Sequence, residues 1–305
     1  MRPLKVGIHL PETERIAPWC DLAAMCRLAE EVGFDSIWVP DHLLMRFPGE
    51  EPQGPWECWS ILSAVAAVTR RVEIGPLVLC TNFRNPALIA KMADTVDEIS
   101  GGRLILGLGA GWHEPEYRAF GFPYEQRVGR FAEAFTIIRT LLREGAIDFQ
   151  GRYYTLRDCE LRPRGPRSGG VPGPAGPPLL IGSRGEQILR MTAPYVDYWN
   201  AWAVWNGNRP DGLAALHAQV DAACVETGRD PAEIGRTLAV FVQLPGGTEP
   251  DNPRAPWLRG TPDELAEALR AFARSGISHV QILLDPNTVE GIAAFAPVLQ
   301  LLDKD

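Results

Sequence analysis

The chain has 305 residues, of which 46% are hydrophobic and 22% are charged, a composition that supports a large core and excludes extensive disorder. Its net charge of −8 argues against a protein that binds nucleic acid, because such proteins present basic faces.

The N-terminus and the cysteines bear on location and on metal binding. The first residues, MRPLKVGIHLP, include no secretory h-region, and no run of about 18 apolar residues predicts a membrane span. The cysteines form no Cys-x-x-Cys pair, so a zinc ribbon or a thioredoxin-like site is not expected. We therefore predict a reduced, cytoplasmic protein with no metal site.

Short runs rich in Val, Ile and Leu alternate with longer segments of helical periodicity, as in buried parallel strands covered by helices. The predicted strands are 5–10, 35–40, 72–79, 103–109, 178–182, 197–203, 237–244 and 278–285. The predicted helices are 18–32, 56–70, 86–99, 125–144, 184–194, 210–227, 261–275 and 288–302. Eight strand–helix units predict an α/β fold, a single (β/α)8 TIM barrel over 1–305.

Local signals mark several helix ends. Gly33 follows the first helix and suits a left-handed stop, and Thr261 stands as an N-cap before Pro262. Pro86 suits the first position of the third helix.

An irregular insertion, 145–177, separates the fourth helix from the fifth strand. Its segment 149–156 predicts a small hairpin, and 163–178 contains six prolines and five glycines. Two interpretations stay open: a solvated loop, or a lid or ligand-binding insertion. Its arginines either pair with surface acids or steer an anion toward the barrel mouth; they are Arg152, Arg157, Arg162, Arg164 and Arg167.

Catalytic residues of a barrel lie where strands end. After the second strand, Asp41 and His42 suit proton transfer near neutral pH, or else a capped loop with a surface histidine. The segment GLGAGW (107–112) lacks the dinucleotide spacing, so its glycines either let a flat ligand approach the backbone or make a tight turn.

The turn Gly182-Ser183-Arg184-Gly185 suits a phosphate, or is an ordinary strand–helix turn. His113, Glu114 and Glu116 match no metal-ligand spacing and are interpreted as a solvated loop. His217 and His279 are interpreted as structural.

Longer stretches resemble a known family. The segment GFDSIWVPDHLL (33–44), the series R-N-P…D-x-I-S-G-G-R…G-x-G-x-G-W within 72–123, the FQGRYY segment and 178–200 look like the luciferase-like monooxygenase superfamily. The match covers most of 1–205. The Asp-His pair and Glu57-Cys58-Trp59 make the chain most similar to the branch that uses coenzyme F420, a deazaflavin.

The resemblance implies a ring system over the barrel mouth, backed by a bulged third strand that often carries a non-prolyl cis peptide. The matching positions here are Leu77 and Val78, the phosphate would sit at Gly182 to Gly185, and His42 matches a position near the ring's reactive edge. Further cofactor contacts are expected at strand ends: His9, Cys80, Thr81, Gly109, Gly111 and Trp112. Known deazaflavin dehydrogenases carry an acid where this chain has Trp112, which argues against a sugar-phosphate dehydrogenase.

We therefore predict an oxidoreductase that transfers a hydride between coenzyme F420 and an unidentified small organic substrate, with Asp41 or His42 as the proton relay. One alternative is a two-component monooxygenase that uses reduced flavin mononucleotide (FMN) and oxygen. Another is a barrel that binds a flavin-like ligand without turnover. The expected partner is a small molecule, with neither nucleic acid nor membrane, and a homodimer is an open option.

Overall fold

The computed structural model describes residue 2 and residues 4–168 and 175–304. They form two compact units. Unit 1 comprises 1–38, 71–73 and 180–305, and unit 2 comprises 39–70 and 74–179. Across the part of the chain that is described, every helix is too short or too polar to cross a membrane.

The strands are arranged in one parallel sheet. Neighbouring strands follow the order β3-β2-β1-β11-β10-β9-β8-β5-β4. The strands at the two ends of this order, β3 (Glu73–Pro76) and β4 (Leu79–Cys80), are consecutive in the chain. Ile74 in β3 also forms a parallel bridge to Leu104, just before β5. The sheet therefore closes almost completely, which confirms the predicted α/β barrel class.

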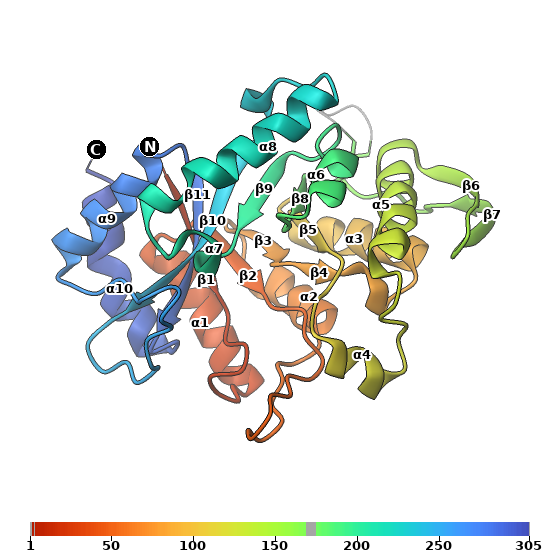
Figure 1. Cartoon of the computed structure of the whole chain (residues 1–305). Helices are drawn as coiled ribbons and strands as arrows, with labels where there is room; N and C mark the ends of the chain where they lie inside the picture. Colours follow the sequence, from red (N-terminus) through yellow and green to blue (C-terminus); the bar gives the residue numbers. More distant parts are fainter. Residues whose placement is uncertain (1, 3, 169–174, 305) are drawn as a thin grey trace. The chain divides into compact units, whose positions relative to one another are not determined.

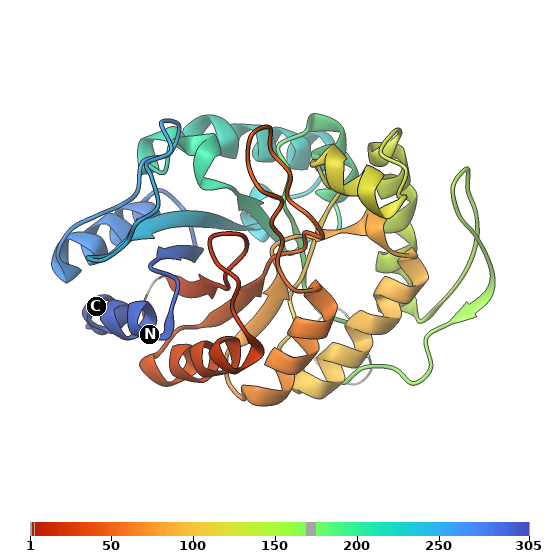
Figure 2. The same ribbon diagram turned by 90° about the horizontal axis from the view of Figure 1, so that it is seen from below.

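Unit 1 contains the run β2-β1-β11-β10-β9-β8 with its helices (Figure 1). Its elements are β1 Lys5–His9, α1 Trp19–Val32, β2 Ser36–Val39, β8 Leu179–Ile181, α6 Glu186–Thr192, β9 Tyr198–Ala201, α7 Ala203–Asn206, α8 Ala214–Glu226, β10 Gly235–Gln243, α9 Pro262–Arg274, β11 His279–Asp285 and α10 Val289–Leu302. Figure 2 shows α1 in red beside α10 in dark blue. Phe34 and Phe295 stack between them with ring centroids 5.5 Å apart.

Unit 2 carries the remaining elements. They are α2 Cys58–Val68, β3, β4, α3 Pro86–Ser100, β5 Leu106–Gly109, α4 Glu114–Phe120, α5 Arg127–Glu144, β6 Ala146–Gln150 and β7 Thr155–Glu160. The last two strands form an antiparallel hairpin that projects beyond α5 (Figure 1). The hairpin predicted over 149–156 is thus confirmed, and its strands extend further in both directions.

The predicted helix ends are confirmed where local chemistry fixes them. Gly33 adopts φ 102° after α1, and Asn85 caps α3 ahead of Pro86. Thr261 and Glu264 form a complete capping box at the start of α9. Two short helices, α4 and α7, escaped prediction because they span only seven and four residues.

The third predicted strand, 72–79, is interrupted between β3 and β4. The interruption falls at Leu77-Val78, whose peptide bond is cis. The break that the family resemblance implied at these two residues is therefore confirmed.

Two arginines of the insertion bond to α3, to α5 and to the chain ahead of β5. Arg164 pairs with Asp94 and donates to the carbonyl of Leu142 near the end of α5. Arg167 pairs with Asp97 and donates to the carbonyl of Leu104, ahead of β5. These partners lie at the ends of helices that precede strands, which in a barrel is the end opposite the active site. Both guanidinium groups pair with acids, as one of the two predicted roles for these arginines expects, and the lid stays a prediction; 169–174 lie outside the described residues.

Buried His279 makes the stability of unit 1 depend on pH. Ser36 Oγ accepts from Trp38 Nε1 and lies 2.7 Å from His279 Nε2, so its hydrogen is directed at the imidazole. Burial lowers the pKa of His279 to about 3. Between that value and its unfolded pKa of about 6.5, the unfolded chain binds a proton that the folded chain does not.

The free energy of unfolding should therefore fall as pH drops below about 6.5, and His279 should contribute about 1.4 kcal/mol per pH unit. Urea unfolding of wild type and His279→Gln at pH 7, 6 and 5 measures this contribution. We expect the wild type to lose more stability than the variant between pH 6 and 5. Parallel losses in the two proteins would contradict the assignment.

Candidate functional site

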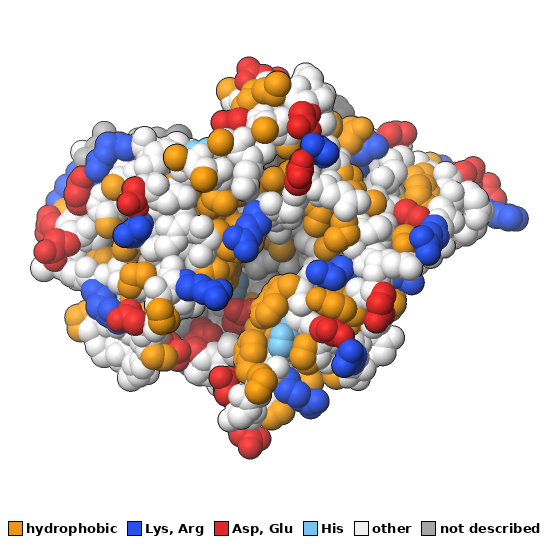
Figure 3. Space-filling view, viewed as in Figure 1, with side chains coloured by type: hydrophobic (Ala, Val, Ile, Leu, Met, Phe, Trp, Pro, Cys, Tyr) orange, Lys and Arg blue, Asp and Glu red, His pale blue; other side chains and the backbone are white. Residues whose placement is uncertain are grey.

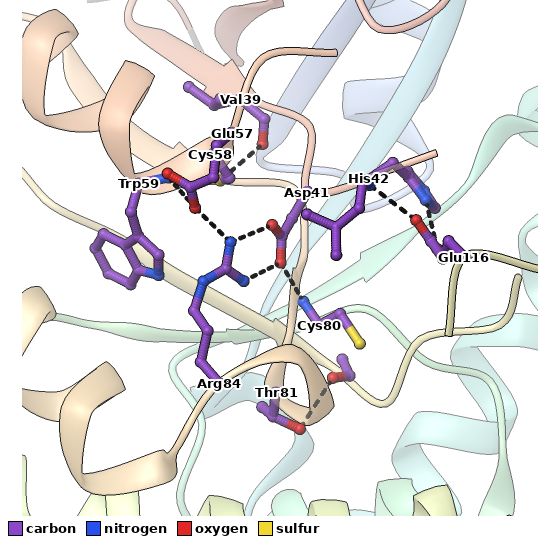
Figure 4. Close-up of polar contacts among 12 residues, drawn as sticks. Val39, Asp41, His42, Glu57, Cys58, Trp59, Cys80, Thr81, Arg84 and Glu116 are labelled. Atoms are coloured by element: carbon purple, nitrogen blue, oxygen red, sulfur yellow. Dashed lines mark hydrogen bonds and ion pairs between the residues drawn. The ribbon is translucent and has the colours of Figure 1, made fainter. Parts of the chain in front are cut away.

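A buried ion pair organises the end of β2 (Figure 4). Both oxygens of Asp41 accept from Arg84 at 2.8 Å, and Oδ2 also accepts from the backbone N–H of Cys80 at 2.8 Å. Arg84 donates at 2.6 Å to Glu57, the N-cap of α2. Burial raises the pKa of Asp41, and Arg84 with the Cys80 N–H acts in the opposite direction. This carboxylate is thus engaged in joining β2, β4 and α2.

A second buried contact joins β4 to the loop after β5. Tyr117 Oη donates to the carbonyl of Ala110 at 2.6 Å and lies 3.0 Å from Cys80 Sγ. Burial raises the pKa of Cys80 to about 12, so the thiol stays protonated and donates to the phenol oxygen. Gly111, at φ +72°, would place a Cβ 2.1 Å from Tyr117 Oη and 2.6 Å from Cys80 Sγ. The glycine is therefore required by protein packing.

Thr81 and Asn82 reinforce the same connection. Thr81 is fully buried and donates to the carbonyl of Gly109 at 3.3 Å. Asn82 donates to the carbonyl of Ala110 at 2.9 Å. The side chains of Cys80 and Thr81 thus bond to protein groups, Cys80 to Tyr117 in α4 and Thr81 to Gly109 at the end of β5.

His42 pairs with a carboxylate from α4 (Figure 4). Its Nδ1 lies 3.0 Å from Glu116 Oε1, and the other oxygen of Glu116 accepts from the N–H of Leu43 at 2.9 Å. The side chain of Glu116 is 1% exposed and that of His42 is 16% exposed. A carboxylate beside Nδ1 holds the proton on that nitrogen and fixes the ring's tautomer.

The solvated-loop interpretation of 113–116 is wrong for His113 and Glu116. His113 is 5% exposed, and its Nε2 accepts from the N–H of Arg46 at 3.0 Å. Because an N–H can only donate, this imidazole is neutral, in agreement with a pKa that burial lowers. The start of α4 therefore holds the loop after β2 in place, a role that long-range contacts create and local spacing cannot reveal.

Aromatic rings surround these histidines. Trp112 lies 5.8 Å from His42 and 5.1 Å from His113 between ring centroids, and it is 56% exposed. Phe47 lies 5.2 Å from His113. Figure 3 shows a histidine with hydrophobic side chains gathered around it on the drawn face.

Other predicted residues belong to unit 1. In the turn after β8, Ser183 Oγ accepts from the N–H of Gly185 at 3.1 Å, so the hydroxyl keeps its own hydrogen for donation. Arg184 is exposed, and its guanidinium carbon lies 5.6 Å from the centroid of the Trp205 ring. His9 is buried, with its ring 6.3 Å from Trp202. His279 is bonded to Ser36 within the core, as the structural interpretation expects.

Unit 2 thus brings together many of the predicted residues, around the ends of β2, β4 and β5. They are Asp41, His42, Leu77, Val78, Cys80, Thr81, Gly109, Gly111 and Trp112. Sequence reasoning missed Arg84 and the role of Glu116; the R-N-P motif that begins at Arg84 was the available signal for the first.

A model of the luciferase-like monooxygenase family matches residues 4–245. The chain belongs to this family. Among curated luciferase-like relatives, it is 32% identical over 180 residues to the pyrimidine monooxygenase RutA of Caulobacter vibrioides, covering 57% of this chain and 48% of the relative. It is 40% identical over 166 residues to the F420-dependent glucose-6-phosphate dehydrogenase of Amycolatopsis mediterranei, covering 53% and 48%. The chain thus spans about half the length of these two relatives.

A solved structure shares the barrel fold of this luciferase-like chain over nearly its whole length. It is an F420-dependent secondary alcohol dehydrogenase in complex with an F420-acetone adduct, with a TM-score of 0.81, 20% identity and 99% of each chain covered. The curated relatives of this chain therefore include both monooxygenases and an F420-dependent dehydrogenase.

Gly111→Ala should destabilise the protein by about 3 kcal/mol, because left-handed strain adds to a clash with Tyr117 and Cys80. Gly121→Ala is a matched control, since Gly121 has φ +76° and no atom lies within 4 Å of its Cβ position. We expect about 1 kcal/mol for the control. Chemical denaturation measures both, and equal losses would show that the packing around Gly111 is not the constraint.

Proposed function

We propose that the protein transfers a hydride between coenzyme F420 and a small organic substrate, with His42 as the proton carrier. The observation that carries the proposal is the pair formed by His42, in the loop after β2, and Glu116 of α4, at a strand end of a luciferase-like barrel. F420-dependent relatives support the choice of cofactor.

The residues of unit 2 suit a planar redox ring. Gly109 at the end of β5 carries no side chain, and exposed Trp112 offers an aromatic face. Bound there, a deazaflavin would supply hydride chemistry. In unit 1, the turn from Gly182 to Gly185 suits a phosphate by itself, because the Ser183 hydroxyl can donate and Arg184 supplies positive charge.

His42 is the residue of this site that can move a proton. Glu116 holds hydrogen on Nδ1 and stabilises the positive charge that forms when Nε2 takes up a proton. Nε2 can therefore receive a proton from a substrate hydroxyl or return one to a substrate oxygen. We assign Asp41 to positioning His42, because its carboxylate is committed to Arg84 and to the Cys80 N–H. We assign Cys80, Thr81 and Gly111 to supporting the wall behind the ring, and His9 stays a predicted cofactor contact.

A second candidate is a monooxygenase that uses reduced FMN and oxygen. The similarity to pyrimidine monooxygenases favours it. Both candidates place the ring in the same family site, so the choice of cofactor separates them.

Titration of the purified protein with F420 and with FMN, followed by absorption and fluorescence, tests the cofactor. We expect tighter binding of F420, and reduction of bound F420 by an alcohol or oxidation of its reduced form by a carbonyl compound. Tighter FMN binding, with oxygen consumed by the reduced flavin, would overturn the proposal in favour of the monooxygenase.

His42→Ala and Glu116→Gln should each lower kcat by about 10², the usual scale of acid–base catalysis, with little change in F420 affinity or melting temperature. The matched control is Glu114→Gln in the same helix, because Glu114 is partly exposed and pairs with Arg118. Nitrogen-15 NMR of the imidazole should show Nδ1–H in wild type and the control, and mixed tautomers in Glu116→Gln. An unchanged kcat in both active-site variants would remove the pair from the mechanism.

A further inference from the structure

Unit 1 carries a row of aromatic rings at the ends of β9 and β10. Trp202 lies 5.9 Å from Phe241 between centroids at an interplanar angle of 85°, and Phe241 lies 5.2 Å from Trp257 at 36°. All three side chains are only partly buried. Two aromatic faces that meet near a right angle form a corner, which suits a flat ring that stacks on one face and presents its edge to the other.

The strand register places Phe241 on the same face of the unit 1 strands as a set of buried polar side chains. Asn200 donates to Thr237 and to Gln281, so these side chains of β9, β10 and β11 face one another. Side chains alternate along a strand, and Phe241 and Leu283 therefore face the same side as Thr237 and Gln281. Phe241 and Leu283 are also direct partners in the β10–β11 pairing.

The row forms an apolar layer between polar ones. On one side lies the buried Asn200–Thr237–Gln281 set. On the other side, Gln243 donates to Asp285 at 2.6 Å. Leu283 is partly exposed, as the three rings are. An apolar layer of this kind at strand ends suits an uncharged ring, because a charged group stacked on the aromatic faces would lose water without a hydrogen bond from them.

Hydrogen bonds hold the corner in place before any ligand arrives. Asn208 accepts from the N–H of Phe241 at 3.2 Å and donates to its carbonyl at 2.9 Å. Trp257 Nε1 donates to the carbonyl of Pro250 at 3.0 Å, and Leu258 pairs with Val242. Because the rings are already ordered, binding costs little conformational entropy.

We propose that this wall binds the substrate through an uncharged aromatic or conjugated ring, which packs into the corner formed by Trp202, Phe241 and Trp257. The inference rests on the proposed function, since it names the substrate class of that oxidoreductase. It assigns the wall to the substrate, because the cofactor ring is assigned to residues of unit 2.

The experiment measures binding of 1-naphthol, with cyclohexanol as a non-planar comparison, by saturation-transfer NMR and calorimetry in the absence of turnover. Phe241→Leu and Trp257→Leu keep an apolar side chain and remove the aromatic face. The control is Trp19→Leu, since Trp19 is a 39% exposed tryptophan of unit 1 in α1, outside the wall. Melting temperatures verify that all variants fold, and F420 affinity is measured for each.

We expect wild type and the Trp19 variant to bind 1-naphthol at least about tenfold more tightly than cyclohexanol, and the two wall variants to lose about tenfold in naphthol affinity. F420 affinity should be equal in all four proteins. Equal naphthol affinity in all four, or no binding to wild type, would overturn the proposal. A parallel loss of F420 affinity in the wall variants would also overturn it, because the wall would then hold the cofactor. Wild type that binds 1-naphthol and no F420 would instead refute the proposed function and retain the ring site.

Discussion

The buried pair of Asp41 and Arg84 is the constraint on which the rest of the candidate site depends. Its carboxylate has no exposed side-chain surface, so without Arg84 it would be an uncompensated charge in the core. Breaking such a pair from one side costs about 3–5 kcal/mol. Arg84 also reaches Glu57 at the start of α2, and Asp41 holds the N–H of Cys80. One ion pair thus fixes Asp41, which follows β2 and directly precedes His42. Through the Cys80 N–H it also fixes the end of β4.

From this pair a series of hydrogen bonds within unit 2 leads to His42. Cys80 contacts Tyr117, which donates to the carbonyl of Ala110. Glu116, the residue before Tyr117 in α4, pairs with His42. This series of contacts ends at His42, which directly follows Asp41 in the chain. His42 is therefore held from both sides, by the chain that follows Asp41 and by a carboxylate on a separate helix. A ring held in this way keeps one tautomer, which acid–base catalysis at a defined atom requires.

The sequence was sufficient for features that depend on local periodicity or on a single backbone requirement. All eight strand–helix units, the Gly33 stop and the Thr261 cap are of this kind. The break at Leu77-Val78 was expected from the family resemblance instead. It failed where side chains distant in sequence decide the outcome. Glu116 looked solvated because its partners lie 73 and 74 positions away in the chain. The placement of the insertion was recoverable, since any segment between a helix and the next strand of a barrel returns to the end opposite the active site.

The two units differ in the kind of chemistry their residues can support. Unit 2 concentrates paired charges and imidazoles around strand ends, whereas the inner wall of unit 1 is aromatic and its polar groups bond to one another. Proton transfer needs ionisable side chains that interact electrostatically. Recognition of a flat uncharged ring needs a surface from which such charged side chains are excluded. Residues for the two tasks therefore cannot share one surface without weakening both. On the proposed assignments, Trp202, Phe241 and Trp257 can vary with the substrate while the Asp41–Arg84 pair and His42 stay fixed, because each set is held by contacts within its own unit.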